Sequence, residues 1–192
     1  SAGTEEYPEV KPLVVQVMEE AGVDMSGHTP KLLSDIPAEV DILITMGCNV
    51  FCPFIPNSHN EDWGLDDPSG GPIEYYRETR DLIKKKVEDL VNQKISEKLP
   101  MQKIVMSKEE AEKTGAVHAF GEKYGDEVSI YFVGETLDSA WSKEFCGGPH
   151  VTNTNKIGHV TINKQEKIGS GIIRIYLVLD NKHVGLSSKT KD

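Results

Sequence analysis

One long amphipathic segment, residues 73–99, constrains the fold of this chain more than any other feature. Apolar side chains return along it at helical spacing and form a single stripe, whereas the opposite side is charged. Pro100 follows the segment and ends the helix, because proline cannot donate a backbone hydrogen bond. We therefore predict one long helix near the middle of the chain. Its stripe consists of Tyr76, Ile83, Val87, Leu90, Val91, Ile95 and Leu99.

The charge balance changes within this predicted helix. Residues 1–90 hold 7 Lys and Arg against 18 Asp and Glu, whereas residues 91–192 hold 14 against 13. The net charge of −10 over 192 residues argues against unspecific attachment to nucleic acid, because phosphate contacts need clustered Lys and Arg. The change of charge indicates two parts of different character that meet in the helix.

Membrane and secretory signals are missing from the sequence. No apolar run is long enough to span a bilayer, and the amino end has no basic-then-apolar leader. Cys48, Cys52 and Cys146 form an odd set, which fits a reducing compartment better than a disulfide framework. We expect a cytoplasmic protein with no membrane partner.

The acidic part has the pattern of an α/β protein. Helical spacing after Pro8 ends at Gly22, a residue typical of helix ends. The apolar run 41–46 predicts a buried parallel strand that delivers Cys48 to a loop at its carboxyl end. Residues 53–71 are rich in Pro, Asn, Asp and Gly, so we predict a long loop there.

The remaining part alternates mainly between strand patterns. We predict strands at 101–106, 128–133, 160–163 and 171–179, the last of them central in its sheet because it is mostly apolar. Ser107 caps a short helix, with Glu110 at the capping-box position. Residues 184–192 are predicted to form a polar tail.

Two motifs in the first part point to a known family. Residues 45–53 read TMGCNVFCP and residues 63–68 read WGLDDP. Residues 1–90 resemble thioredoxin-coupled arsenate reductases of the low-molecular-weight tyrosine phosphatase family. The resemblance implies that Asp67 is a general acid and that Cys48 and Cys52 are a redox pair.

The nucleophile loop of that family, Cys-x5-Arg, has no counterpart in the sequence. None of the three cysteines is followed six positions later by Arg. Since covalent catalysis requires that nucleophile, we expect neither phosphatase nor reductase activity. Asp67 then becomes a turn residue, and Cys48 and Cys52 become packed thiols or a disulfide.

Three motifs in the second part point to a different family. Residues 120–126 read FGEKYGD, residues 144–151 read EFCGGPHV and residues 169–175 read GSGIIRI. Residues 87–180 resemble the editing domain of alanyl-tRNA synthetase. The resemblance implies that Cys146 and His150 belong to a zinc site that serves the hydrolysis of a mischarged aminoacyl ester, with tRNA as the partner.

Cys146 and His150 alone are half of such a site. The family's other two ligands form a His-x3-His pair, and no two histidines of this chain stand four residues apart. Catalytic zinc needs three protein ligands and a water molecule. The sequence leaves several groups open as a third ligand: a carboxylate, His118, His159, Cys48 or Cys52.

We therefore predict an α/β chimera of two incomplete catalytic parts. A parallel sheet fragment of a phosphatase-like fold is joined through one long helix to a mixed or antiparallel α+β editing-domain fragment. The predicted parts are residues 1–90, residues 91–183 and the tail 184–192. We expect no catalysis and no cofactor. The alternatives are zinc-dependent deacylation of mischarged aminoacyl-tRNA and an arsenate reductase-like or phosphatase-like redox activity, and exposed sheet edges favour a homodimer.

Overall fold

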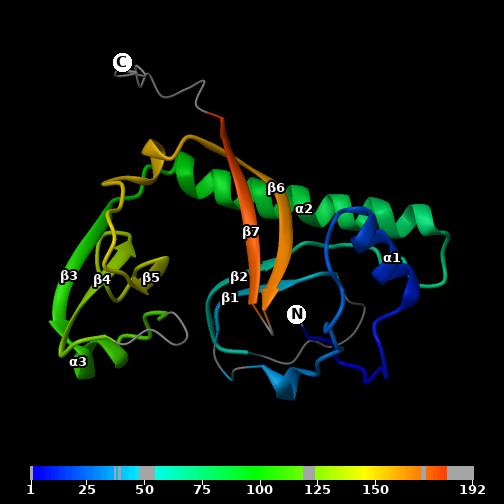
Figure 1. The fold of residues 1–192 in the computed structure, drawn as a ribbon, viewed down its shortest axis with the longest axis horizontal. Helices are drawn as coiled ribbons and strands as arrows, with labels where there is room; N and C mark the ends of the chain where they lie inside the picture. Colours follow the sequence, from blue (N-terminus) through cyan, green and yellow to red (C-terminus); the bar gives the residue numbers. More distant parts are fainter. Residues whose placement is uncertain are drawn as a thin grey trace. The chain divides into compact units, whose positions relative to one another are not determined.

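The computed structural model describes residues 2–36, 38, 40–47, 55–118, 124–169 and 172–180. The chain divides into two compact units (Figure 1). The first unit contains residues 1–88 and 162–177, and the second contains residues 89–161 and 178–192. The predicted tail 184–192 and the motif at 120–123 lie outside the described residues.

The first unit begins with a short helix and a two-stranded parallel sheet. Helix α1 spans Pro12–Glu20, and Gly22 follows it at φ +77°, a backbone conformation that glycine adopts without a steric penalty. Strand β1 spans Val40–Thr45 and pairs in parallel with β2, Asn57–Asp62. The predicted helix and parallel strand are confirmed.

The prediction of an unbroken loop at residues 53–71 is wrong, because β2 lies within it. Its side chains are polar throughout, so no apolar alternation announces a strand. The register Leu43 to Asn60 and Thr45 to Asp62 shows that backbone pairing with β1 forms the strand. Tertiary pairing has overridden the low strand propensity of Asn and Asp here.

Helix α2 spans Ile73–Ser96 as one continuous helix, as predicted. It ends where Lys98 adopts φ +56° and Pro100 follows, so the chain leaves the helical path there. Tyr76 is the buried member of its stripe, and the other members are half-buried. Within the first unit, Arg77 binds Glu20 of α1 at 2.7 Å.

The second unit is built on an antiparallel sheet with the strand order β3-β4-β5. The strands span Met101–Ser107, Glu127–Val133 and Ser142–Phe145. One sheet face is buried against helix α3, Lys108–Glu112. The core residues are Ala111, Ala116, Val128, Ile130 and Phe145. Sequence alternation predicts β4 correctly, since its odd and even residues differ in burial.

The amino end of α3 has the predicted cap. The Ser107 hydroxyl accepts a hydrogen bond from the Glu110 backbone N–H, and it donates to the Glu110 carboxylate at 2.7 Å. The hydrogen bonds that the Ser107 hydroxyl and backbone donate to this carboxylate hold the pKa of the Glu110 carboxyl below its usual value. The strand β3 therefore passes directly into a closed helical turn.

The last two strands, β6 at His159–Gly169 and β7 at Ile172–Asp180, form a two-stranded sheet. The prediction that residues 171–179 are central in a sheet is wrong. Ile175, Leu177 and Leu179 are each at least half exposed. The apolar run predicted a strand correctly, but among the described residues β7 has one neighbouring strand, β6, and not the two that a central strand needs.

Helix α2 satisfies part of the outer edge of β6 through side chains. Asn92 accepts from the Val160 backbone N–H at 2.8 Å and donates to the Val160 carbonyl at 2.8 Å. One turn earlier, the Glu88 carboxylate accepts from the Ile162 backbone N–H at 2.7 Å. An amide and a carboxylate thus take the place of a neighbouring strand.

The three sheets do not merge within the described ranges of the chain. The predicted α/β class is confirmed, with a parallel pair in the first unit and antiparallel pairing in the second. No helix in the described part of the chain is both long and apolar enough to cross a bilayer.

Candidate functional site

The outer face of the β3-β4-β5 sheet carries a row of polar and aromatic side chains. Lys103 lies opposite Tyr131, and Tyr131 lies opposite Glu144, so the three residues cross the sheet side by side. The neighbouring residues Ile130 and Phe145 point to the other face and are buried. Strand alternation thus separates a core face from a face with chemical groups.

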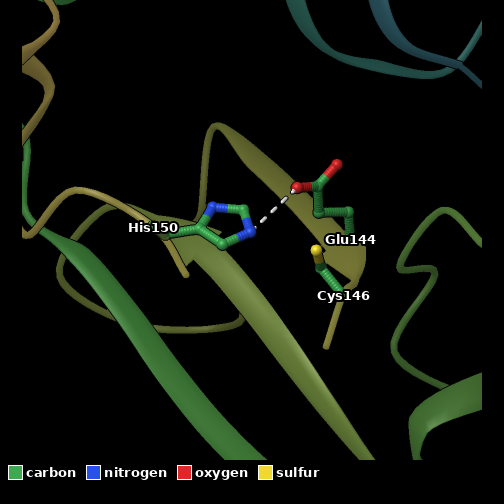
Figure 2. Close-up of side chains that lie close together, drawn as sticks. All are labelled: Glu144, Cys146 and His150. Atoms are coloured by element: carbon green, nitrogen blue, oxygen red, sulfur yellow. Dashed lines mark ion pairs between the residues drawn. The ribbon is translucent and has the colours of Figure 1, made fainter. Parts of the chain in front are cut away.

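Cys146 and His150 join this row. The Cys146 sulfur, a nitrogen of the His150 ring and a carboxylate oxygen of Glu144 all lie within 4.8 Å of one another. His150 Nε2 is 3.6 Å from Glu144 Oε1. Figure 2 shows the His150 ring and the Glu144 carboxylate facing each other, with the Cys146 sulfur beside them. We call these three residues the Glu-Cys-His cluster.

Backbone contacts fix Cys146 at the end of β5. Its N–H donates to the Ser129 carbonyl at 3.1 Å, which continues the pairing with β4 for one residue. The Gly148 N–H donates to the Cys146 sulfur at 3.5 Å. This contact holds the sulfur in place at the end of the strand. Cys146 is a free, half-buried cysteine.

The His150 ring is oriented by stacking. Its centroid lies 3.9 Å from that of the Tyr131 ring, and the two planes differ by 16°. Lys103 Nζ lies 5.6 Å from the Tyr131 centroid. The His150 side chain is 17% exposed and that of Glu144 is 52% exposed, so the imidazole is covered while the carboxylate reaches solvent.

The donor set of the cluster fits a divalent cation of the zinc type. Zinc accepts one thiolate, one imidazole and one carboxylate, with bonds of about 2.0–2.3 Å. Tetrahedral bonds of that length place neighbouring ligand atoms roughly 3.4–3.8 Å apart. The 3.6 Å between His150 Nε2 and Glu144 Oε1 already matches this spacing. Three ligands leave a fourth position for water.

The sequence left the third ligand open, and a carboxylate, that of Glu144, lies beside Cys146 and His150. Glu144 and Cys146 stand two residues apart at the end of β5, and that spacing turns side chains to one face of a strand. This spacing could have identified Glu144. The other described candidates lie elsewhere: His118 packs edge-on against Tyr124 and Phe145, and His159 begins β6.

In the first unit, Asp67 forms a turn with the residue two positions later. Its carboxylate accepts the Ser69 backbone N–H at 2.9 Å and the Ser69 hydroxyl. These two hydrogen bonds hold the pKa of the Asp67 carboxyl below its usual value. A general acid must be protonated at its working pH, so this environment opposes that role. Cys48 and Cys52 lie outside the described residues.

Comparison with known proteins confirms the second resemblance. The family model described as "Threonyl and Alanyl tRNA synthetase second additional domain" matches residues 128–176. The alanine–tRNA ligase of Ligilactobacillus salivarius (strain UCC118) is 48% identical over 94 residues, which are 49% of this chain and 10% of the relative. The ligase of Borreliella burgdorferi is 46% identical over 95 residues, 50% of this chain and 15% of the relative. The chain therefore spans only a small fraction of these curated relatives.

The first resemblance is confirmed as well. A solved structure described as "An arsenate reductase in the phosphate binding state" is 35% identical, with a TM-score of 0.44, over 48% of this chain and 73% of that chain. The family model described as "Low molecular weight phosphotyrosine protein phosphatase" matches residues 1–102, more than half of the 192 residues. The chain therefore belongs to the low molecular weight phosphotyrosine protein phosphatase family, with a segment of synthetase type joined to it.

Proposed function

We propose that this protein is a metal-binding hybrid that catalyses neither family's reaction. The Glu-Cys-His cluster holds a zinc-type cation, and the chain turns over neither arsenate nor phosphate esters. One observation carries the metal proposal, namely that three donor atoms of different residues lie within 4.8 Å of one another on one sheet face. The environment of Asp67 supports the second half of the proposal.

The cluster has the properties of a binding site beyond its donor atoms. The Gly148 N–H supports the Cys146 sulfur, and the Tyr131 ring orients His150. Groups behind the ligands that fix their orientation strengthen a metal site. When bound, zinc supplies a Lewis acid and an acidic water molecule.

Metal analysis tests the proposal directly. Protein purified without chelator should contain zinc in near-stoichiometric amount. The variants Cys146→Ser and His150→Ala should each bind zinc at least about tenfold more weakly, as should Glu144→Gln, because each removes one of the three ligands. Competition with a chromophoric chelator measures these affinities.

Matched variants outside the cluster serve as controls. His159→Ala removes an exposed histidine and Glu135→Gln an exposed carboxylate, so both should keep the affinity of the unaltered protein. Unaltered protein without measurable zinc affinity would refute the metal site. An effect of Cys146→Ser and His150→Ala without any effect of Glu144→Gln would reduce the site to two ligands.

The first unit is tested by activity. Phosphate-ester hydrolysis and thioredoxin-coupled arsenate reduction should both stay at background. The hydrogen bonds from Ser69 lower the pKa of the Asp67 carboxyl, so they oppose the protonated form that a general acid needs. Turnover of an aryl phosphate that falls in the Asp67→Asn variant would contradict the proposal.

Zinc-dependent deacylation of mischarged aminoacyl-tRNA is a second candidate. The fourth coordination position that a three-ligand set leaves open favours it, since a water molecule could occupy that position. The test is hydrolysis of Ser-tRNA by the zinc-loaded protein beside its Cys146→Ser variant. Hydrolysis by the unaltered protein that is lost in the Cys146→Ser variant would contradict the proposal that the second unit is inactive.

A further inference from the structure

Strand β7 exposes a continuous apolar strip. Ile175, Leu177 and Leu179 are 56%, 54% and 50% exposed, and their spacing of two residues puts them on one face of the strand. Soluble monomers rarely expose a row of large aliphatic side chains of this kind. The opposite face carries Tyr176, whose hydroxyl donates to Glu166 of β6, and Val178, which is 51% exposed.

The two outer edges of the β6-β7 sheet differ. On β6, side chains of α2 bind the backbone at Val160 and Ile162. Strand β7 has β6 as its one partner strand within the described ranges. An edge strand that is apolar and has no covering element is a template for pairing with another chain. Among the described residues, the β7 edge is therefore the side of this sheet without a partner strand.

We propose that β7 pairs antiparallel with β7 of a second copy of this chain, with Leu177 on the twofold axis. This register sets Arg174 of each copy opposite Asp180 of the other. It also sets Ile175 opposite Leu179 and Leu177 opposite its own equivalent. A register shifted by one residue, centred on Tyr176, would lose the charge pair and place Asp180 opposite Ile172.

The charges at the two ends of β7 select this partner. Arg174 is the basic residue of the strand and Asp180 is its acidic end, so the strand complements itself only when it runs antiparallel. The Arg174 guanidinium lies 3.8 Å from the Glu166 carboxylate and its side chain is 55% exposed, so it can also reach a carboxylate of the second copy.

The same pairing explains the apolar strip and limits the size of the assembly. Opposite residues of a strand pair share a face, and the two apolar strips would merge into one patch. The side chains of α2 occupy the far edge of each sheet at Val160 and Ile162, which opposes further strand pairing there and favours a closed dimer.

The decisive experiment uses complementary charge variants of the full-length protein. In a homodimer of Arg174→Glu, the introduced carboxylate would face Asp180, and in a homodimer of Asp180→Lys, the introduced ammonium would face Arg174. Each variant alone should dimerise roughly tenfold more weakly than the unaltered chain, since like charges oppose each other at two places. An equimolar mixture should regain the dimer, because both places then pair opposite charges. Sedimentation velocity across a wide concentration range measures all four samples.

A second variant tests the axis itself. Leu177→Lys would place two ammonium groups beside each other, and the dimer should be lost. Val105→Lys changes a side chain of β3 with nearly the same exposed fraction, 55% against 54%, and should leave the dimer intact. Far-UV circular dichroism confirms that each variant is folded.

Three outcomes would overturn the proposal. The unaltered protein could remain monomeric at every concentration. The dimer could survive Leu177→Lys. The mixture of charge variants could fail to associate although the unaltered chain dimerises, which would place the contact on another surface or in another register. None of these outcomes depends on zinc, so the dimer and the metal site succeed or fail separately.

Discussion

Gly47 shows how a single residue limits the loop after β1. Its φ is +79°, and a Cβ atom there would lie 2.6 Å from the Leu65 backbone nitrogen. Gly47→Ala should lower the free energy of unfolding by about 2–4 kcal/mol, because the clash adds to the cost of the left-handed conformation. Urea titration of both proteins measures the difference.

Gly22 is the matched control for this prediction. It has a similar φ of +77°, but a Cβ atom there would meet nothing within 4 Å. Gly22→Ala should therefore cost only the conformational part, about 1–2 kcal/mol. Equal losses in the two variants would show that the contact with Leu65 has no energetic effect.

Among single residues, the sequence predicts the members of a motif better than their partners. Cys146 and His150 are visible from the linear motif, because their spacing is local. Glu144 stands two residues before Cys146, so the same local spacing could have identified it, whereas Tyr131 reaches His150 from a different strand. Such contacts depend on strand register, which the sequence pattern does not specify across a long connection.

Thr154 binds backbone groups at the carboxyl end of α2, so its substitution tests how much that end contributes to stability. Its side chain donates to the Lys94 carbonyl at 2.9 Å and accepts from the Leu99 N–H at 3.0 Å, and the residue is 5% exposed. Thr154→Val keeps the shape of the side chain but removes its hydrogen bonds to these two half-buried backbone groups. We expect a loss of about 1–3 kcal/mol in the free energy of unfolding.

The control for Thr154 is a threonine at the surface. Thr152 is exposed and accepts from Lys156, so Thr152→Val should change the free energy of unfolding by less than about 0.5 kcal/mol. Chemical unfolding compares the two variants. If they behave alike, Thr154 is not the residue that secures the end of α2.

The contact of α1 with α2 should depend on pH. Hydrogen bonds from Arg77 lower the pKa of the Glu20 carboxyl. A lowered folded-state pKa stabilises the protein above the unfolded pKa, and this stabilisation is lost as the pH falls through the folded value. Acidification below about pH 4.5 should therefore weaken the fold less in Arg77→Met than in the unaltered chain. The measurement is the unfolding midpoint of both proteins along a pH series. If the pair of Glu20 and Arg77 does not contribute, the two curves of midpoint against pH run parallel.

Among helices and strands, helices are easier to predict than sheet edges. A helix carries its own hydrogen bonds, so the periodic stripe of α2 suffices. Strand β2 is polar and forms by pairing with β1, and β7 is apolar without being covered. The order of strands within a sheet depends on contacts between segments far apart in the sequence, and local composition does not predict those contacts.

Across the complete chain, zinc should stabilise only the unit that contains the Glu-Cys-His cluster. Ligand binding at about 100 times the dissociation constant adds about 2.7 kcal/mol to the unit that binds. Calorimetry should therefore show one part of the unfolding profile move to higher temperature with zinc while the other stays in place. The Cys146→Ser variant should show no zinc-dependent movement. A uniform upward movement of the entire profile would mean that the chain unfolds as one cooperative block.

The two side chains by which α2 holds β6 are four residues apart, at Glu88 and Asn92. An α-helix turns by about 100° per residue, so four residues make slightly more than one revolution. Adding or removing a single residue between them would swing one of these groups far around the helix axis and break its hydrogen bond to the strand. Two helical segments joined inside α2 therefore keep both hydrogen bonds to β6 only if the junction leaves Glu88 and Asn92 on the same side of the helix. A junction that rotates one of them away leaves the strand with a single side-chain contact.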